Sequence, residues 1–182
     1  MLRRVGLSVA ISAALLVAGC ADKGGSSPVP AMPSASSSPS AAAVAPTAAT
    51  DPDHYDPARD PAADLRAALA LAATDHKEIL IDFGADWCPD CQVLERLFQS
   101  GQTRPLLQRD YHVVAVDVGQ FNLNLGFAAK YVNLTTSGIP ALVVLTPSGK
   151  TRIATNDGSF ENARTMNNGQ VNAFLTQWAP TV

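Results

Sequence analysis

The stretch DFGADWCPDCQ, residues 82–92, decides the fold of this chain. Its two cysteines, Cys88 and Cys91, are separated by two residues and directly follow an apolar run, EILIDF, at 78–83. That run is short and rich in β-branched residues, which predicts a buried strand. Apolar residues then recur at helical spacing, which predicts a helix from about Cys88 to Ser100. The cysteine pair is therefore expected where a strand passes into the first turn of a helix.

The rest of the chain after residue 58 alternates between helical and strand patterns. A helix is predicted from Pro61, with Asp60 as its N-cap, ahead of the first strand. Further strands are predicted at 112–118, 141–145 and 150–155, and further helices at 125–132 and 168–178. This order predicts an α/β domain: a central mixed β-sheet flanked by helices, with an extra N-terminal helix.

Composition limits both the number of domains and the classes of partner. The 182 residues are 47% hydrophobic and 16% charged, which suffices for one domain with a real core. The formal net charge of −3 argues against a nucleic-acid partner, which would favour clustered Lys and Arg. Three cysteines are too few for a disulfide scaffold or for a four-cysteine zinc site.

The N-terminus has the pattern of an export signal. Arg3 and Arg4 precede an apolar stretch at 5–17, which is shorter than the ~20 residues that a membrane-spanning helix needs. The ending LVAGC resembles a bacterial lipobox, so we expect a lipoprotein signal peptide at 1–19 and a lipid on Cys20. The alternatives are an ordinary signal peptide with a chance cysteine, or an uncleaved anchor.

Location follows from this resemblance. A lipid on Cys20 would hold the chain in the bacterial cell envelope, facing the periplasm. The residue after the cysteine is Ala21 and not Asp, which by the sorting rule of enteric bacteria favours the outer membrane.

The segment at 20–58 is rich in Ser, Pro and Ala and offers almost no large apolar side chains to bury. We interpret it as a flexible tether behind the lipidated cysteine; a pro-segment or a glycosylated stalk are the alternatives. The folded domain is expected at 59–182.

The cysteine pair has three candidate uses. At the start of a helix, Cys88 faces unpaired N–H groups and the positive end of the helix dipole, which favour its thiolate. Residues i and i+3 are close enough for a disulfide between Cys88 and Cys91, and the sheltered Cys91 suits a resolving role. A zinc site would need further ligands, and His54, His76 and His112 are scattered. A structural staple would close a very short loop and stabilise little, so a working redox pair is favoured.

Two motifs resemble the thioredoxin family: ILIDFGADWCPDC at 79–91, and SGIPALVVL at 137–145. The long first helix makes the chain similar to periplasmic thiol-reductase domains in particular. The resemblance implies the thioredoxin fold, with Cys88 as nucleophile, Cys91 as resolving cysteine and Trp87 shielding the pair.

The same resemblance assigns three further residues. Pro140 matches a cis-proline that faces the disulfide, and with Ile139 it would bind an extended substrate segment. Asp82 matches a buried carboxylate that moves protons to and from Cys91, and burial should raise its pKa. Thioredoxin pairs that carboxylate with a lysine near the position of Val113, and the strand at 112–118 has none.

The residues between the cysteines, Pro89 and Asp90, also depart from thioredoxin, and we expect them to tune the redox potential. Strong oxidants of the family tend to carry a histidine there. A carboxylate near Cys88 should instead disfavour its thiolate and make the pair a reductant, although solvent exposure and salt would screen the effect.

The predicted function is a lipid-anchored envelope thiol–disulfide oxidoreductase that reduces or exchanges protein disulfides, with no cofactor and no metal. Its expected partners are disulfide-containing envelope proteins, a membrane-embedded electron donor, and the membrane through the lipid on Cys20. Two alternatives stay open: a metallochaperone or cytochrome-assembly factor, and a non-catalytic binding module.

Overall fold

The computed structural model describes residues 55–181. The expected signal peptide at 1–19, the expected lipid on Cys20, His54 and most of the expected tether lie outside the described residues, so those assignments stay predictions. The described part includes Tyr55, which lies before the expected start of the domain and is buried in it.

A mixed sheet of four strands, in the order β2-β1-β3-β4, forms the centre of the domain. Strand β1 (Glu78–Gly84) pairs parallel with β2 (Tyr111–Asp117) and antiparallel with β3 (Ala141–Leu145). Strand β4 (Thr151–Ala154) completes a hairpin with β3. Every residue of β1 and β3 is buried, because helices cover both faces of the sheet.

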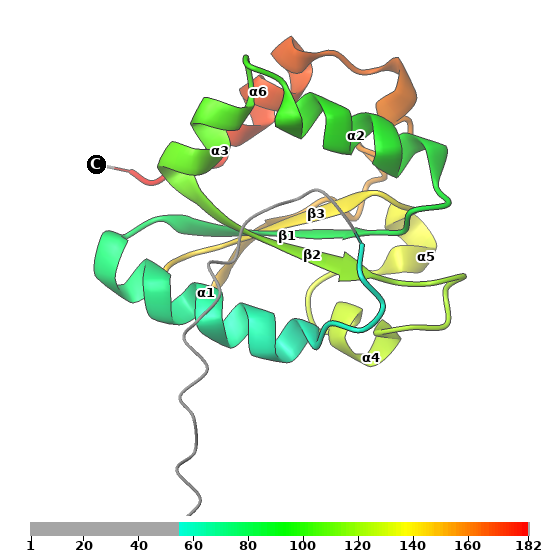
Figure 1. The fold of residues 1–182 in the computed structure, drawn as a ribbon, viewed down its shortest axis with the longest axis horizontal. Helices are drawn as coiled ribbons and strands as arrows, with labels where there is room; N and C mark the ends of the chain where they lie inside the picture. Colours follow the sequence, from blue (N-terminus) through cyan, green and yellow to red (C-terminus); the bar gives the residue numbers. More distant parts are fainter. Residues whose placement is uncertain (1–54, 182) are drawn as a thin grey trace, which may run out of the picture. The chain divides into compact units, whose positions relative to one another are not determined.

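Helices lie on both faces of the sheet (Figure 1). One face is covered by α1 (Pro61–Asp75) and α4 (Leu125–Ala128), whose buried side chains pack with Ile79, Ile81 and Phe83 of β1. The opposite face is covered by α2 (Pro89–Gln99), α3 (Arg104–Asp110) and α6 (Asn168–Trp178), which pack with Leu80. Two short elements, α5 (Leu134–Ser137) and η1 (Ala163–Thr165), complete the order. The predicted α/β thioredoxin fold with an extra N-terminal helix is confirmed.

Two local predictions differ from the structure. The helix predicted at 125–132 ends at Ala128, and the chain continues to Val132 through hydrogen-bonded turns. Helix α3 was not predicted, because its seven residues, RPLLQRD, are too few to show an apolar period. Its Leu107 nevertheless reaches the core.

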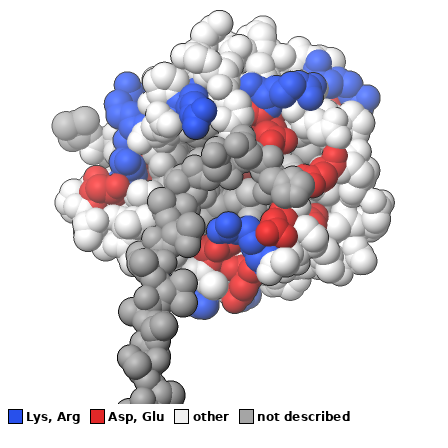
Figure 2. Space-filling model, viewed as in Figure 1, with Lys and Arg blue, Asp and Glu red and all other residues white. Residues whose placement is uncertain are grey.

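Acidic and basic side chains are intermixed over the face of the domain shown in Figure 2. Charges of one sign do not collect there into a single patch. Within residues 55–181, none of the helices has the length and apolar character needed to cross a bilayer.

Candidate active site

Cys88 occupies the N-cap of α2 and lies next to Cys91 in the first turn. Its Sγ accepts a hydrogen bond from the backbone N–H of Cys91 at 3.2 Å, so the sulfur takes up one of the donors that a helix leaves unpaired at its start. Both cysteines are buried free thiols. The N–H of Cys91 therefore points at the sulfur that we expect to act as the nucleophile.

The loop before β3 closes over Cys88. The thiol of Cys88 donates to the backbone carbonyl of Ile139, with 3.6 Å between Sγ and O. Ile139 and Pro140 are both buried, and the bond between them is cis. The structure therefore brings together the cysteine that we expect to be the nucleophile and the two residues that we expect to bind substrate.

Asp82 lies in β1 and is 3% exposed. Burial raises its pKa to about 7, against a hydrogen bond from Tyr55 that lowers it. Oδ2 accepts that bond at 2.8 Å, whereas Oδ1 has no hydrogen-bond partner among the described residues. Burial also raises the pKa of Cys91, and the charge of Asp82 adds to this effect. Cys91 is thus a thiol with a raised pKa, and Asp82 is a carboxylate whose pKa of about 7 lies near neutral pH.

Tyr55 is one residue of this site that sequence reasoning missed, and Arg164 is another. Tyr55 comes from the segment before α1, which we assigned to the tether by composition. Gly84, the glycine that ends the buried strand β1, was the available signal, because a glycine in a strand often marks a close approach by another group. A Cβ on Gly84 would stand 2.7 Å from Cε1 of the Tyr55 ring, so the glycine makes the room that the ring fills.

Trp87 lies at the surface beside the cysteine pair and is 46% exposed. Its indole N–H donates to the carbonyl of Gly119 at 2.8 Å, and its ring meets Phe121 edge to face at 6.3 Å between centroids. Phe121 is itself 42% exposed and has a φ of 58°, an unusual conformation for a bulky residue. Together they present an apolar surface next to Cys88.

Asp90 is buried at 4% exposure, which contradicts the expectation of a solvent-exposed carboxylate. Its two oxygens bind Arg164 of η1, and the guanidinium lies 2.8 Å from Oδ2. Pro89, the other residue between the cysteines, is exposed.

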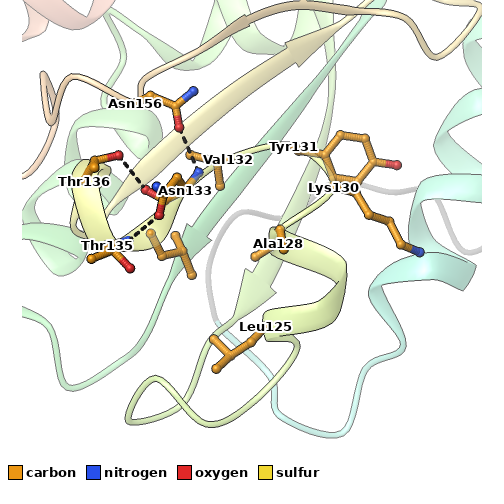
Figure 3. A pocket seen from close by; sticks show the side chains of 11 residues that line it. Leu125, Ala128, Lys130, Tyr131, Val132, Asn133, Thr135, Thr136 and Asn156 are labelled. Atoms are coloured by element: carbon orange, nitrogen blue, oxygen red, sulfur yellow. Dashed lines mark hydrogen bonds between the residues drawn. The ribbon is translucent and has the colours of Figure 1, made fainter.

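A hollow of about 720 Å³ lies beside α4 and α5 (Figure 3). Asn133 makes three hydrogen bonds in the wall of the hollow. Its carboxamide oxygen accepts from the N–H of Thr135, its backbone N–H donates to the side chain of Asn156, and its backbone carbonyl accepts from the hydroxyl of Thr136. These bonds cap α5 and fasten the loop. The wall holds no cysteine, histidine or carboxylate, so we do not assign the redox chemistry to this hollow.

No group of three or more His, Cys, Asp or Glu residues suited to a metal ion occurs in the part of the chain that the structure describes. His112 is buried with Nε2 at 3.0 Å from Asp75, and His76 caps the end of α1. Neither forms a zinc site with the cysteines.

Comparison with known proteins agrees with this geometry. A family model described as thioredoxin-like matches residues 60–147. The solved structure of a disulphide isomerase from Xylella fastidiosa Temecula1 is 35% identical, covers 68% of this chain and 94% of that chain, and superposes with a TM-score of 0.65. The chain belongs to the thioredoxin family. By family it is a thioredoxin-like thiol–disulfide oxidoreductase, as predicted.

A second relative is much longer than this chain. It is the thiol:disulfide interchange protein DsbD 1 of Pseudomonas aeruginosa, which is 35% identical over 88 residues. The match covers 48% of this chain and only 14% of that protein. The match therefore concerns one part of a larger protein.

Proposed function

We propose that this protein is a lipid-anchored thiol–disulfide oxidoreductase of the bacterial cell envelope, which reduces or exchanges protein disulfides through Cys88 and Cys91. The observation that carries the proposal is the hydrogen bond from the Cys91 N–H to Cys88 Sγ at the start of α2. It stabilises the attacking thiolate and holds the second thiol beside it.

The reaction proceeds in two exchanges. The Cys88 thiolate attacks one sulfur of a substrate disulfide, forms a mixed disulfide and releases the other substrate sulfur as a thiolate. Cys91 then loses its proton and attacks Cys88 Sγ, which forms the Cys88–Cys91 disulfide and releases the second substrate thiolate. The substrate gains two electrons and two protons, and the cysteine pair is oxidised.

Asp82 is the base that this second exchange needs. Burial keeps Cys91 protonated, and the same burial gives Asp82 a pKa of about 7, so its carboxylate can accept the proton at neutral pH. Trp87 precedes Cys88 in the chain, and the carbonyl of Ile139, which precedes Pro140, accepts from the Cys88 thiol. Trp87, Ile139 and Pro140 would contact the substrate, and Asp90 would set the redox potential.

The predicted lipid on Cys20 would keep the domain in the envelope, facing the periplasm at the outer membrane. The oxidised pair must then be reduced again. A membrane-embedded electron donor would supply those electrons, and disulfide-containing envelope proteins would receive them. The thiol:disulfide interchange protein among the relatives supports this kind of exchange.

Trapping tests the proposal. Cys91→Ala should accumulate mixed disulfides between Cys88 and envelope proteins, because the first exchange occurs and the second cannot. The Cys88→Ala/Cys91→Ala double variant is the matched control and should trap nothing. If the single variant traps no more than the double variant, the proposal is wrong. If Cys88→Ala keeps the cellular role, the alternative of a non-catalytic binding module is favoured instead.

Disulfide isomerisation is a second candidate, favoured by the name of the Xylella relative. An isomerase uses Cys88 to open a wrong disulfide and to re-form another, so it can work without Cys91. Reactivation of a scrambled disulfide protein by Cys91→Ala at near wild-type rate would favour isomerisation, and its loss would favour net reduction.

A further inference from the structure

Tyr55 is fixed to the site at two points. Its hydroxyl donates to Oδ2 of Asp82 at 2.8 Å, and its backbone N–H donates to Oδ1 of Asp86 at 3.1 Å. The side chain is 4% exposed. A residue that precedes the first helix is thus held against the carboxylate that the redox cycle uses.

The geometry of β1 explains how the ring reaches this carboxylate. Side chains alternate along a strand, so Asp82 and Gly84 share one face. Gly84 has no side chain, and the Tyr55 ring fills the space next to Asp82. The register partners of Asp82 on the neighbouring strands are Ala115 and Leu142, which provide no charge and no hydrogen-bond donor in their side chains.

Tyr55, from the segment before α1, and Glu95 of α2 act on the pKa of Asp82. The charge of Asp82 acts in turn on Cys91 of α2 and raises its pKa. Burial, followed by the charge of Asp82, raises the pKa of Tyr55 well above its ordinary value, so the phenol stays protonated and remains a donor. Tyr55 is therefore the group that stabilises the ionised form of Asp82, whereas Glu95 opposes it.

We propose that Tyr55 is a positioning residue of the redox site: its hydroxyl holds Oδ2 of Asp82 and leaves Oδ1 to take the proton of Cys91. This inference rests on the proposed function. In this role Tyr55 stabilises the Asp82 carboxylate, as a basic residue on a neighbouring strand would otherwise do. When Cys91 attacks Cys88 Sγ, its proton moves to Asp82, and Tyr55 exchanges no proton and no electron.

The test uses the full chain with Cys20→Ser in every protein, so that Cys88 and Cys91 are the only thiols. The reduced protein is mixed with 5,5′-dithiobis(2-nitrobenzoic acid). Attack by Cys88 releases one thionitrobenzoate, and attack by Cys91 on the mixed disulfide releases a second. The rate of the second release is measured from pH 5 to pH 9.

The expected wild-type rate of second release rises with pH around a midpoint near 7, the pKa of Asp82. Tyr55→Phe keeps the ring and removes the hydroxyl, so the midpoint should move upward by about one pH unit, with a several-fold slower second release at pH 7. The first release should be unchanged.

Tyr111→Phe is the matched control, because it removes another buried tyrosine hydroxyl, which donates to the carbonyl of Leu175. It should lower thermal stability and leave the midpoint in place. An equal midpoint in wild type and Tyr55→Phe would overturn the role of Tyr55 while both releases continue. Absence of the second release in the wild type would overturn the proposed function itself, and this inference with it.

Discussion

Asp90 and Arg164, which lie far apart in the sequence, form a closed ion pair against the first turn of α2. Oδ1 of Asp90 accepts from the backbone N–H of Arg164 at 2.8 Å and from Nε at 3.1 Å, and Oδ2 lies 2.8 Å from the terminal guanidinium nitrogen. The carboxylate between the two cysteines is therefore buried and matched by a cation. Its expected repulsion of the Cys88 thiolate is reduced by this partner.

Removing the cation should make the cysteine pair more reducing. In Arg164→Ala, Asp90 keeps its backbone donor and loses its positive partner, so its charge acts on the Cys88 thiolate more strongly. The reduced form is destabilised, and the potential should fall by about 30 mV, a tenfold change in the equilibrium constant. Equilibration with glutathione at low salt measures it.

Two comparisons control this experiment. Asp90→Asn leaves Arg164 as an unmatched cation and should move the potential in the opposite direction. Arg109→Ala breaks an ion pair of the same kind, with Asp110 in α3, and should leave the potential unchanged. Shifts of equal sign in Arg164→Ala and Asp90→Asn would contradict the electrostatic explanation.

Asp82 should make the stability of the reduced protein depend on pH. Its folded pKa, about 7, exceeds the unfolded value of about 3.9, so the native state holds an extra proton between these values. The free energy of unfolding contributed by this group is present below about pH 4 and is lost as pH rises through about 7.

Asp82→Asn removes this pH-dependent loss of stability, because an asparagine side chain does not titrate. The difference in unfolding free energy between Asp82→Asn and wild type should therefore grow from pH 4 to pH 8 by up to about 4 kcal/mol in favour of the variant. Urea unfolding of both proteins at the two pH values tests this, and the difference cancels the titration of other groups. A pH-independent difference would show that Asp82 titrates near its ordinary pKa.

Gly84→Ala should destabilise the domain by displacing the Tyr55 ring. The added methyl group overlaps the ring, and overpacking of this kind costs about 1–3 kcal/mol. In a Tyr55→Ala background the space is open, so the same substitution should cost much less. Denaturant unfolding of the double-mutant cycle measures the coupling.

Gly101→Ala is the control for this cycle, because a Cβ there meets no heavy atom within 4 Å. Its effect should stay within about 0.5 kcal/mol. If Gly84→Ala lowers the free energy of unfolding equally with and without Tyr55, the Tyr55 ring is not the reason that position 84 requires glycine.

Phe121→Gly should weaken action on protein disulfides and spare small ones. Gly adopts the φ of 58° readily, so the fold should not suffer, while the apolar ring beside Trp87 is lost. We expect kcat/KM for a protein disulfide to fall about 5–10-fold, which corresponds to about 1–1.4 kcal/mol of binding. Second-order rates with a protein disulfide and with a small aromatic disulfide make the comparison, and an equal loss for both would refute substrate contact by Phe121.

The sequence alone predicted the central part of the fold. The buried run of β1, the helical period of α2 and the β3–β4 hairpin are local patterns, and these elements appear near their predicted bounds. Helix α3 could not be predicted in this way, because its seven residues are too few to show a helical period. The packing of Leu107 in the core stabilises it instead.

The site was only partly predictable, because its polar partners come from distant segments. The cysteine spacing indicated the first turn of α2, but nothing local to Asp90 shows that Arg164 lies beside it. Composition placed Tyr55 in the tether, since neighbouring Pro and Ala residues outweighed one aromatic side chain. In both cases tertiary contacts override the local signal.

The contact between Tyr55 and Asp82 also defines the smallest piece of this protein that could be transplanted. A fragment that begins at Asp60 would contain both thiols, the Ile139–Pro140 loop and every strand of the sheet, so it would contain all of the fold's regular elements. It would nevertheless lack the Tyr55 hydroxyl that donates a hydrogen bond to the Asp82 carboxylate. A fusion or an excised domain should therefore begin upstream of Tyr55 to keep the hydrogen bond between Tyr55 and Asp82.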